Sequence, residues 1–139
     1  MKSRLVGHLS AHSMLNPHQS AYIKSHSTET VLLSLHDLLI KRISQQELTG
    51  ICLLDLSAAF DTIDHSTLLH RLNTWFGFDG TPQSWLSSYL SSRSFAVSAH
   101  GSLSPTFSSS HGVPQGFVLG PLLFILYTTP LSAIISSTP

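Results

Sequence analysis

The chain has 139 residues, which suits one domain or part of one, and its 42% hydrophobic content is enough to build a core. Seven lysines and arginines balance seven aspartates and glutamates, so charge alone does not indicate a nucleic-acid-binding protein. The single cysteine, Cys52, excludes an internal disulfide scaffold and a multi-cysteine zinc site, and its apolar neighbours predict a small buried residue. The N-terminus does not resemble a signal peptide, and we expect an intracellular protein.

The N-terminal third contains two candidate helices. A short amphipathic helix is possible around Leu5–Leu15, ending at Asn16–Pro17. Apolar residues then recur at helical spacing between Ser27 and Arg42. Ser27 suits the N-cap of this second helix, and two basic residues lie in its last turn, where the helix dipole favours cations.

The segment Gly50–Leu56 is continuously apolar except for Asp55 near its end. A continuous rather than alternating apolar run predicts a strand that is covered on both faces. Two further helices follow. The first spans His65–Phe76, with Asp64 as its N-cap and Gly77 as its C-cap, and the second begins at Thr81–Pro82.

Alternating apolar and polar residues predict a half-exposed strand at Ser94–Ala99. A hairpin turn at His100–Ser102 and a return strand at Thr106–Ser110 complete this unit. A glycine-containing loop, Gly112–Gly116, leads into the strongly apolar segment Val118–Ile135. The pattern as a whole predicts an α/β chain with helices packed on a small sheet.

Asp55 is the first candidate for chemistry, because an ionised carboxylate in an apolar strand needs a partner. It can hold a divalent metal ion, since magnesium prefers carboxylate oxygens, or it can simply cap the following turn. Asp61 and Asp64 are best explained by local turn and capping hydrogen bonds. The scattered histidines have no zinc-ligand spacing and are expected at the surface or in turns.

Two motifs together resemble a known family. Leu53–His65 resembles motif A of the reverse transcriptases of non-LTR (LINE-type) retrotransposons, and Gly112–Phe124 resembles their motif B. Upstream, Gln19–Tyr22 and His26–Thr30 resemble the fingers motif. The resemblance extends from Leu5 to Leu131 and is greatest to elements of the CR1/L2 kind.

The resemblance implies specific roles. Asp55 is then the motif A carboxylate that binds the catalytic Mg²⁺ ions, and the backbone near Leu56 helps to hold the metals and the triphosphate. Phe60 is the gate residue beneath the sugar of the incoming nucleotide. Gln115 and Gly116 lie over that nucleotide and the template base. In two-metal catalysis one ion activates the primer hydroxyl and the other neutralises the leaving pyrophosphate.

The sequence also departs from the family pattern. The Phe/Tyr-Ala-Asp-Asp motif C that follows motif B in the family is not found before Pro139. Ile23 stands where the fingers motif usually has a triphosphate-contacting arginine, and only Lys24 follows it. Phe117 replaces the usual serine of motif B, a change that other reverse transcriptases tolerate.

We therefore expect a partial polymerase right-hand fold of the palm-and-fingers α/β type. Residues 1–48 are expected to be fingers-like and residues 49–139 to form an incomplete palm. The implied partners are an RNA template, a DNA primer and a deoxynucleoside triphosphate, with weak nucleic-acid binding by this neutral chain. By itself the chain is expected not to polymerise DNA, and apolar groups of Val118–Ile135 are expected to cause self-association.

Two other interpretations remain open. The chain can be a non-catalytic retroelement remnant or interaction fragment. It can also be a membrane-anchored protein with a span at 117–135, although Gly120, Pro121 and Pro130 and the lack of basic flanks argue against a span.

Overall fold

The computed structural model describes residues 2–91, 93–113, 116 and 118–137. These residues form two compact units. The first unit contains Met1–Asn16 together with Ala58–Pro139, and the second contains Pro17–Ser57.

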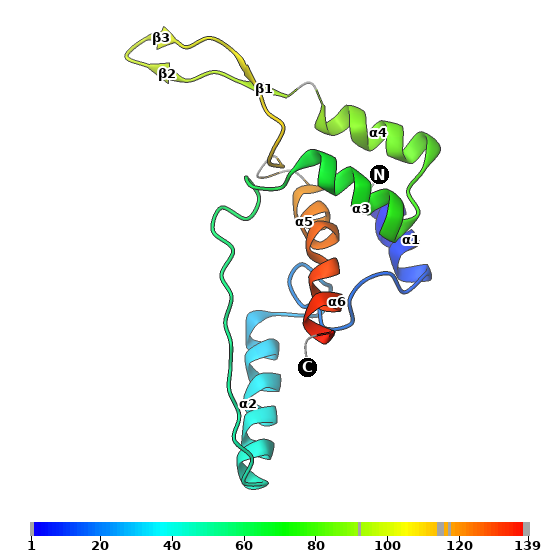
Figure 1. Cartoon of the computed structure of the whole chain (residues 1–139), viewed down its shortest axis with the longest axis vertical. Coiled ribbons are helices and arrows are strands. Elements are labelled where there is room, and N and C mark those ends of the chain that lie inside the picture. The colour runs from blue at the N-terminus through cyan, green and yellow to red at the C-terminus, as the bar shows by residue number, and fades with distance from the viewer. Residues whose placement is uncertain (1, 92, 114–115, 117, 138–139) are drawn as a thin grey trace. The chain divides into compact units, whose positions relative to one another are not determined.

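The regular secondary structure of the described residues consists of helices and short antiparallel strands, as predicted for a mixed α/β chain (Figure 1). The helices are α1 (Lys2–Ala11), α2 (Thr28–Ser44), α3 (His65–Phe76), α4 (Gly80–Leu90), α5 (Gly120–Thr128) and α6 (Pro130–Ser136). The strands are β1 (Ser94–Phe95), β2 (Ser98–Ala99), β3 (Ser102–Leu103) and β4 (Phe107–Ser108). All of these elements except α2 belong to the first unit.

The core of the first unit is built around α3, which packs against both α4 and α5. Apolar residues at helical spacing on α3 point into this core, and each contributes about 1.5–3 kcal/mol when fully buried. The fully buried side chains are Leu9, Ile63, Leu68, Leu72, Phe76, Leu86, Leu90, Leu123 and Leu126. The core therefore joins segments from both ends of the chain.

Both predicted caps of α3 are confirmed. Asp64 is the N-cap, and its carboxylate accepts a hydrogen bond from the backbone N–H of Thr67 at 2.7 Å. Gly77 ends the helix in the left-handed conformation, with φ +64°. Helix α4 begins at Gly80, slightly before the predicted Thr81–Pro82, and Asp79 is its N-cap without a side-chain capping bond.

The apolar segment Val118–Ile135 contains two short helices, α5 and α6. Leu123 and Leu126 of α5 are buried in the core, and Arg71 of α3 donates a hydrogen bond to the carbonyl of Tyr127. The Arg71 guanidinium also lies 4.5 Å from the centre of the Tyr127 ring, a cation–π contact. Among the described residues, no helix combines the length and apolar character that a membrane crossing requires.

The strands form two antiparallel pairs. Strand β1 pairs with β4, and β2 pairs with β3. The predicted turn is confirmed: His100 and Gly101 have φ +50° and +79°, the positive values of a two-residue hairpin turn of type I′. The predicted strand Ser94–Ala99 is split in two, because the amide of Val97 donates to the Ser104 hydroxyl rather than to a backbone carbonyl.

Helix α2 of the second unit begins as predicted. Ser27 and Thr30 form a reciprocal capping box, and Glu29, Lys41 and Arg42 lie in the expected end turns. The helix has no buried residues. The expectation that Val118–Ile135 exposes apolar groups is confirmed for Val118, Ile134 and Ile135, which are 65%, 63% and 58% exposed. Helix α2 exposes apolar side chains as well, among them Leu32, Leu33 and Ile43.

The predicted strand at Gly50–Leu56 is wrong, since these residues have no regular secondary structure. Leu53 and Leu54 are 85% and 74% exposed, and Cys52 is exposed rather than buried. A strand needs a neighbour to complete its backbone hydrogen bonds. In the part of the chain that the structure describes, the two ladders involve only residues 94–108, so this segment has no strand beside it.

Candidate functional site

The end of the predicted motif A and the beginning of motif B meet in the first unit, and a tight turn precedes their contact. Ala58 has a positive φ of +51°, and its carbonyl accepts hydrogen bonds from the amides of Asp61 and Thr62 at 2.8 and 3.1 Å. The Thr62 hydroxyl donates to the same carbonyl at 3.2 Å. The turn reverses the chain just before α3.

This turn is joined to the start of the predicted motif B by backbone hydrogen bonds. The amide of Val113 donates to the carbonyl of Phe60 at 2.9 Å, and the amide of Gly112 donates to Ile63 at 2.8 Å. The amide of His65 donates in the other direction, to Ser110 at 3.1 Å. We call the two joined segments, Phe60–His65 and Ser110–Val113, the junction.

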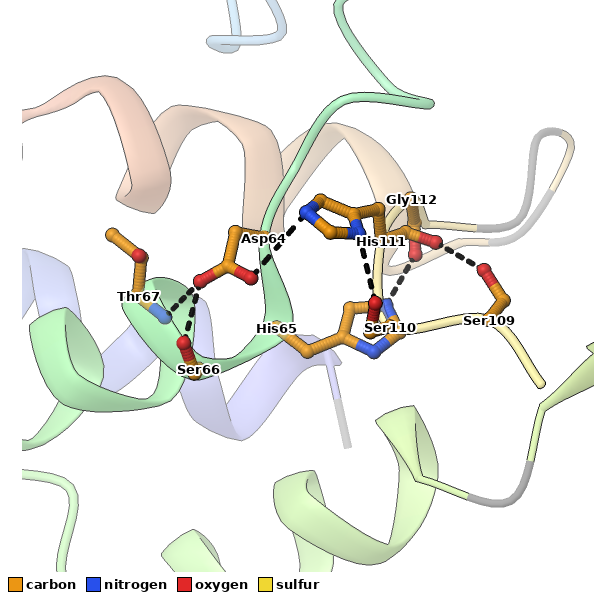
Figure 2. A network of polar contacts seen from close by, with 8 residues as sticks. All are labelled: Asp64, His65, Ser66, Thr67, Ser109, Ser110, His111 and Gly112. Atoms are coloured by element: carbon orange, nitrogen blue, oxygen red, sulfur yellow. Dashed lines mark hydrogen bonds and ion pairs between the residues drawn. The ribbon is translucent and has the colours of Figure 1, made fainter.

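Side chains reinforce the junction (Figure 2). The Nε2 atom of His65 lies 2.7 Å from the carbonyl oxygen of Gly112, and His65 is only 9% exposed. Because a carbonyl only accepts, this imidazole nitrogen carries a proton and donates it. His65 was expected at the surface or in a turn, and that prediction is wrong: the ring is buried between the two segments that it joins.

A second pair of side chains crosses the junction. The Nε2 atom of His111 lies 3.6 Å from a carboxylate oxygen of Asp64, whose side chain is 30% exposed. The Ser110 hydroxyl lies 2.9 Å from Nδ1 of His111, and the Ser109 hydroxyl donates to the His111 carbonyl at 2.7 Å. Figure 2 shows these contacts side by side with the cap of α3.

Asp64 is held in its charged form. The Ser66 hydroxyl donates to its carboxylate at 2.6 Å, and the Thr67 amide donates at 2.7 Å. The hydrogen bond from Ser66 is the largest cause that lowers the pKa of Asp64 well below its ordinary value, and Thr67 and His111 act in the same direction. Asp64 is therefore a structural carboxylate, as its predicted local role requires.

Gly112 allows the two segments to approach closely. Its φ is +85°, a conformation that other residues adopt only at a cost. A Cβ at this position would lie 3.2 Å from the carbonyl oxygen of Asp61 and 3.3 Å from its Cα. Glycine is therefore favoured at position 112 for two reasons: the backbone has a positive φ, and a side chain would crowd Asp61.

One predicted nucleotide-site residue, Phe60, belongs to the junction, and another, Gly116, follows it in the sequence. Phe60 is half-buried, and its ring centre lies 5.2 Å from that of Phe124 on α5. Gly116 is exposed and has φ +79°. Gln115 lies outside the described residues.

The remaining predicted site residues belong to the second unit. Asp55 and Leu56 are exposed in the irregular segment that precedes the turn. Lys24 is exposed in a turn before α2, where its carbonyl lies 3.1 Å from Nδ1 of His26. The roles predicted for these three residues stay predictions.

A metal site needs several donors, and the described residues contain no group of three or more His, Cys, Asp or Glu side chains placed to share an ion. Asp64 is occupied by its hydrogen bonds, and Asp55 is the one carboxylate that motif A places for a metal role. These residues do not form a complete site for two ions.

Sequence reasoning missed His65 and His111 as junction residues. Neither residue belongs to a periodic sequence pattern that reveals its contact, because each has its partner 47 positions away: Gly112 for His65 and Asp64 for His111. The available signal was the place of each residue at the edge of a motif: His65 ends the predicted motif A, and His111 precedes motif B.

A turn that carries the end of one motif is thus joined to the first residues of a second motif, and the comparison with known proteins shows which family has this pair of motifs. The chain belongs to the family described as reverse transcriptase (RNA-dependent DNA polymerase), whose model matches residues 1–138. Its relatives place it among the non-LTR retrotransposon members of that family.

Three relatives illustrate this. The probable RNA-directed DNA polymerase from transposon X-element of Drosophila melanogaster is 32% identical over 130 residues, covering 90% of this chain and 14% of that protein. The RNA-directed DNA polymerase from mobile element jockey of Drosophila funebris is 30% identical over 115 residues, covering 81% and 12%. The Pol polyprotein from type-1 retrotransposable element R2 of Popillia japonica is 29% identical, covering 97% and 19%.

The chain thus spans less than a fifth of the length of each of these three proteins. No solved structure gives a significant match. The mixed fold of helices and small antiparallel sheets fits part of a palm-and-fingers polymerase.

Proposed function

We propose that this chain contributes the nucleotide-binding side of an RNA-directed DNA polymerase in a LINE-type retrotransposon. The observation that carries the proposal is the junction, where two backbone hydrogen bonds fix the end of motif A to Gly112 and Val113 of motif B, and a third fixes it to Ser110 just before that motif. Both motifs supply residues to one nucleotide site in this family, so a rigid link between them serves that site.

The proposed roles follow the motifs. Asp55 supplies a carboxylate to the catalytic metal ions, and the backbone near Leu56 helps to hold the triphosphate. Phe60, supported by the ring of Phe124, packs beneath the sugar. Gln115 and Gly116 lie over the incoming nucleotide. Lys24 approaches the triphosphate from the fingers, which we assign to residues 1–48, with residues 49–139 belonging to the palm.

Members of this family use divalent metal ions, and we propose Mg²⁺, which prefers carboxylate oxygens and substrate phosphates as ligands. Asp55 alone does not hold two such ions at catalytic spacing. A Phe/Tyr-Ala-Asp-Asp motif elsewhere in the polymerase has to supply the other carboxylates.

The proposed partners are an RNA template, a DNA primer and a deoxynucleoside triphosphate. The balance of seven basic and seven acidic residues gives the chain little electrostatic attraction for phosphates. We infer that most of the grip on template and primer comes from other parts of the polymerase, and that this chain alone binds nucleic acid weakly.

A graft tests the proposal. This chain replaces the matching segment of the jockey-element polymerase, and primer extension is measured on a primed RNA template with Mg²⁺. We expect template-dependent synthesis that falls by at least about a hundredfold in Asp55→Asn, because removal of a charged group that stabilises the transition state typically costs this much. Asp37→Asn is the matched control, since Asp37 is an exposed acid on α2.

The 139-residue chain on its own should incorporate no more nucleotide than its Asp55→Ala variant. Synthesis by the graft that survives Asp55→Asn would contradict the metal role of Asp55. A graft that folds but never extends the primer would favour the alternative, a non-catalytic retroelement remnant or interaction fragment.

A further inference from the structure

We propose that His65 is a positioning residue for the incoming nucleotide, acting through its imidazole hydrogen bond to Gly112. This role deepens the proposed function and rests on it for the link to nucleotide binding. His65 does not touch the nucleotide in this proposal; it holds the beginning of motif B in place.

The geometry begins with the carbonyl of Gly112. This carbonyl follows the amide that bonds to Ile63 and precedes the amide of Val113 that bonds to Phe60. The Nε2–H of His65 donates to it at 2.7 Å. The chain is therefore fixed at three consecutive polar groups just before motif B continues toward Gly116.

The backbone of His65 holds the same segment as its side chain. Its own amide donates to the Ser110 carbonyl at 3.1 Å, so backbone and side chain of one residue hold both sides of His111. His65 is also the first residue of α3, which Asp64 caps and the core anchors through Leu68. The N-terminal end of α3 is therefore held by its cap and by the core, and the segment that leads into motif B is bonded to this fixed end.

The imidazole of His65 supplies the hydrogen-bond donor. A partly buried carbonyl that loses its donor is destabilised, and leucine, though similar in size, offers no donor. Glutamine offers an amide N–H near the position of Nε2. The pair His65→Leu and His65→Gln therefore separates the hydrogen bond from simple packing.

Hydrogen exchange of the 139-residue chain, followed by NMR, tests the positioning directly. In His65→Leu we expect the amides of Gly112 and Val113 to exchange at least about tenfold faster, while those of Leu72 and Leu123 in the core keep their protection. His65→Gln should recover much of the protection. His70→Leu is the matched control, because His70 is an exposed residue on the same helix.

Steady-state kinetics in the jockey-element graft test the functional link. We expect His65→Leu to raise KM for the deoxynucleoside triphosphate about tenfold, with a smaller change in kcat and none in the affinity for the primed template. A merely structural defect would lower the amount of active enzyme and leave KM unchanged. His65→Gln should lie close to the unmodified graft.

The outcomes are distinct. Unchanged exchange at Gly112 and Val113 in His65→Leu overturns the inference, and so does a loss in kcat with KM unaltered. Loss of protection across α3 as well would show a folding role instead and also overturn it. If the unmodified graft makes no DNA, the proposed function fails, and the exchange experiment alone decides whether His65 positions motif B.

Discussion

The backbone of Gly112 lies against that of Asp61, so closely that a single methyl group at residue 112 would meet the Asp61 carbonyl oxygen at 3.2 Å. We predict that Gly112→Ala destabilises the first unit by about 1–3 kcal/mol, the cost of a strained left-handed residue plus a shift of the backbone. Urea unfolding followed by circular dichroism measures this change.

Gly116→Ala is the control for Gly112→Ala. Gly116 has a similar φ of +79°, but a Cβ there would meet nothing within 4 Å. Its substitution should therefore cost only the conformational part, about 1 kcal/mol. Equal losses in the two variants would show that the contact with Asp61 is unimportant.

The second prediction concerns Asp64 and pH. At pH 7, Asp64→Ala should lower the free energy of unfolding by about 1 kcal/mol, the usual value of an N-cap. The pKa of Asp64 in the folded protein lies below its ordinary value of 3.8, so the charged carboxylate stabilises the fold above that pH. The difference between the wild type and the variant should shrink as the pH falls below about 4.

Asp79→Ala is the matched control for Asp64→Ala. Asp79 is also an N-cap, at the start of α4, but its side chain makes no capping hydrogen bond. Its removal should change stability by less than about 0.5 kcal/mol. A loss at Asp64 that stays constant from pH 7 to pH 3 would contradict the electrostatic explanation.

The third prediction concerns self-association, which we propose to occur through α2. Leu32, Leu33 and Ile43 on this helix are 59%, 63% and 65% exposed. Leu33→Glu should raise the dissociation constant of the self-associated form at least about tenfold, because a buried leucine contributes about 1.5–3 kcal/mol. Sedimentation equilibrium measures this constant. Ser34→Glu adds the same charge at the neighbouring polar position and should have little effect, whereas a monomeric wild type would refute the proposal.

Local signals were enough to predict much of the fold. Asp64 and Gly77 were correctly assigned to the two ends of α3, because capping depends on residues within one turn of the helix. The His100–Gly101 turn was found for the same reason, since positive φ values at its two positions favour such residues. These features need no information about distant parts of the chain.

Signals that depend on a distant partner failed. Gly50–Leu56 has the composition of a buried strand, yet composition does not supply the neighbouring backbone that a strand requires. The same limit explains why His65 was misjudged: its partner, Gly112, is 47 residues away. The candidate site was located from the sequence only through its resemblance to motifs A and B.

The junction also closes a loop in the chain. Between His65 and Gly112 lie α3, α4 and the hairpin of β1–β4, and both ends of this stretch are fixed by the same hydrogen bonds. The entropy cost of closing a flexible loop rises only with the logarithm of its length, by about 0.6 kcal/mol for each doubling. Insertions near the exposed His100–Gly101 tip thus add little to this closing cost, and a lineage of such elements is free to lengthen or shorten the hairpin while the two motifs stay joined.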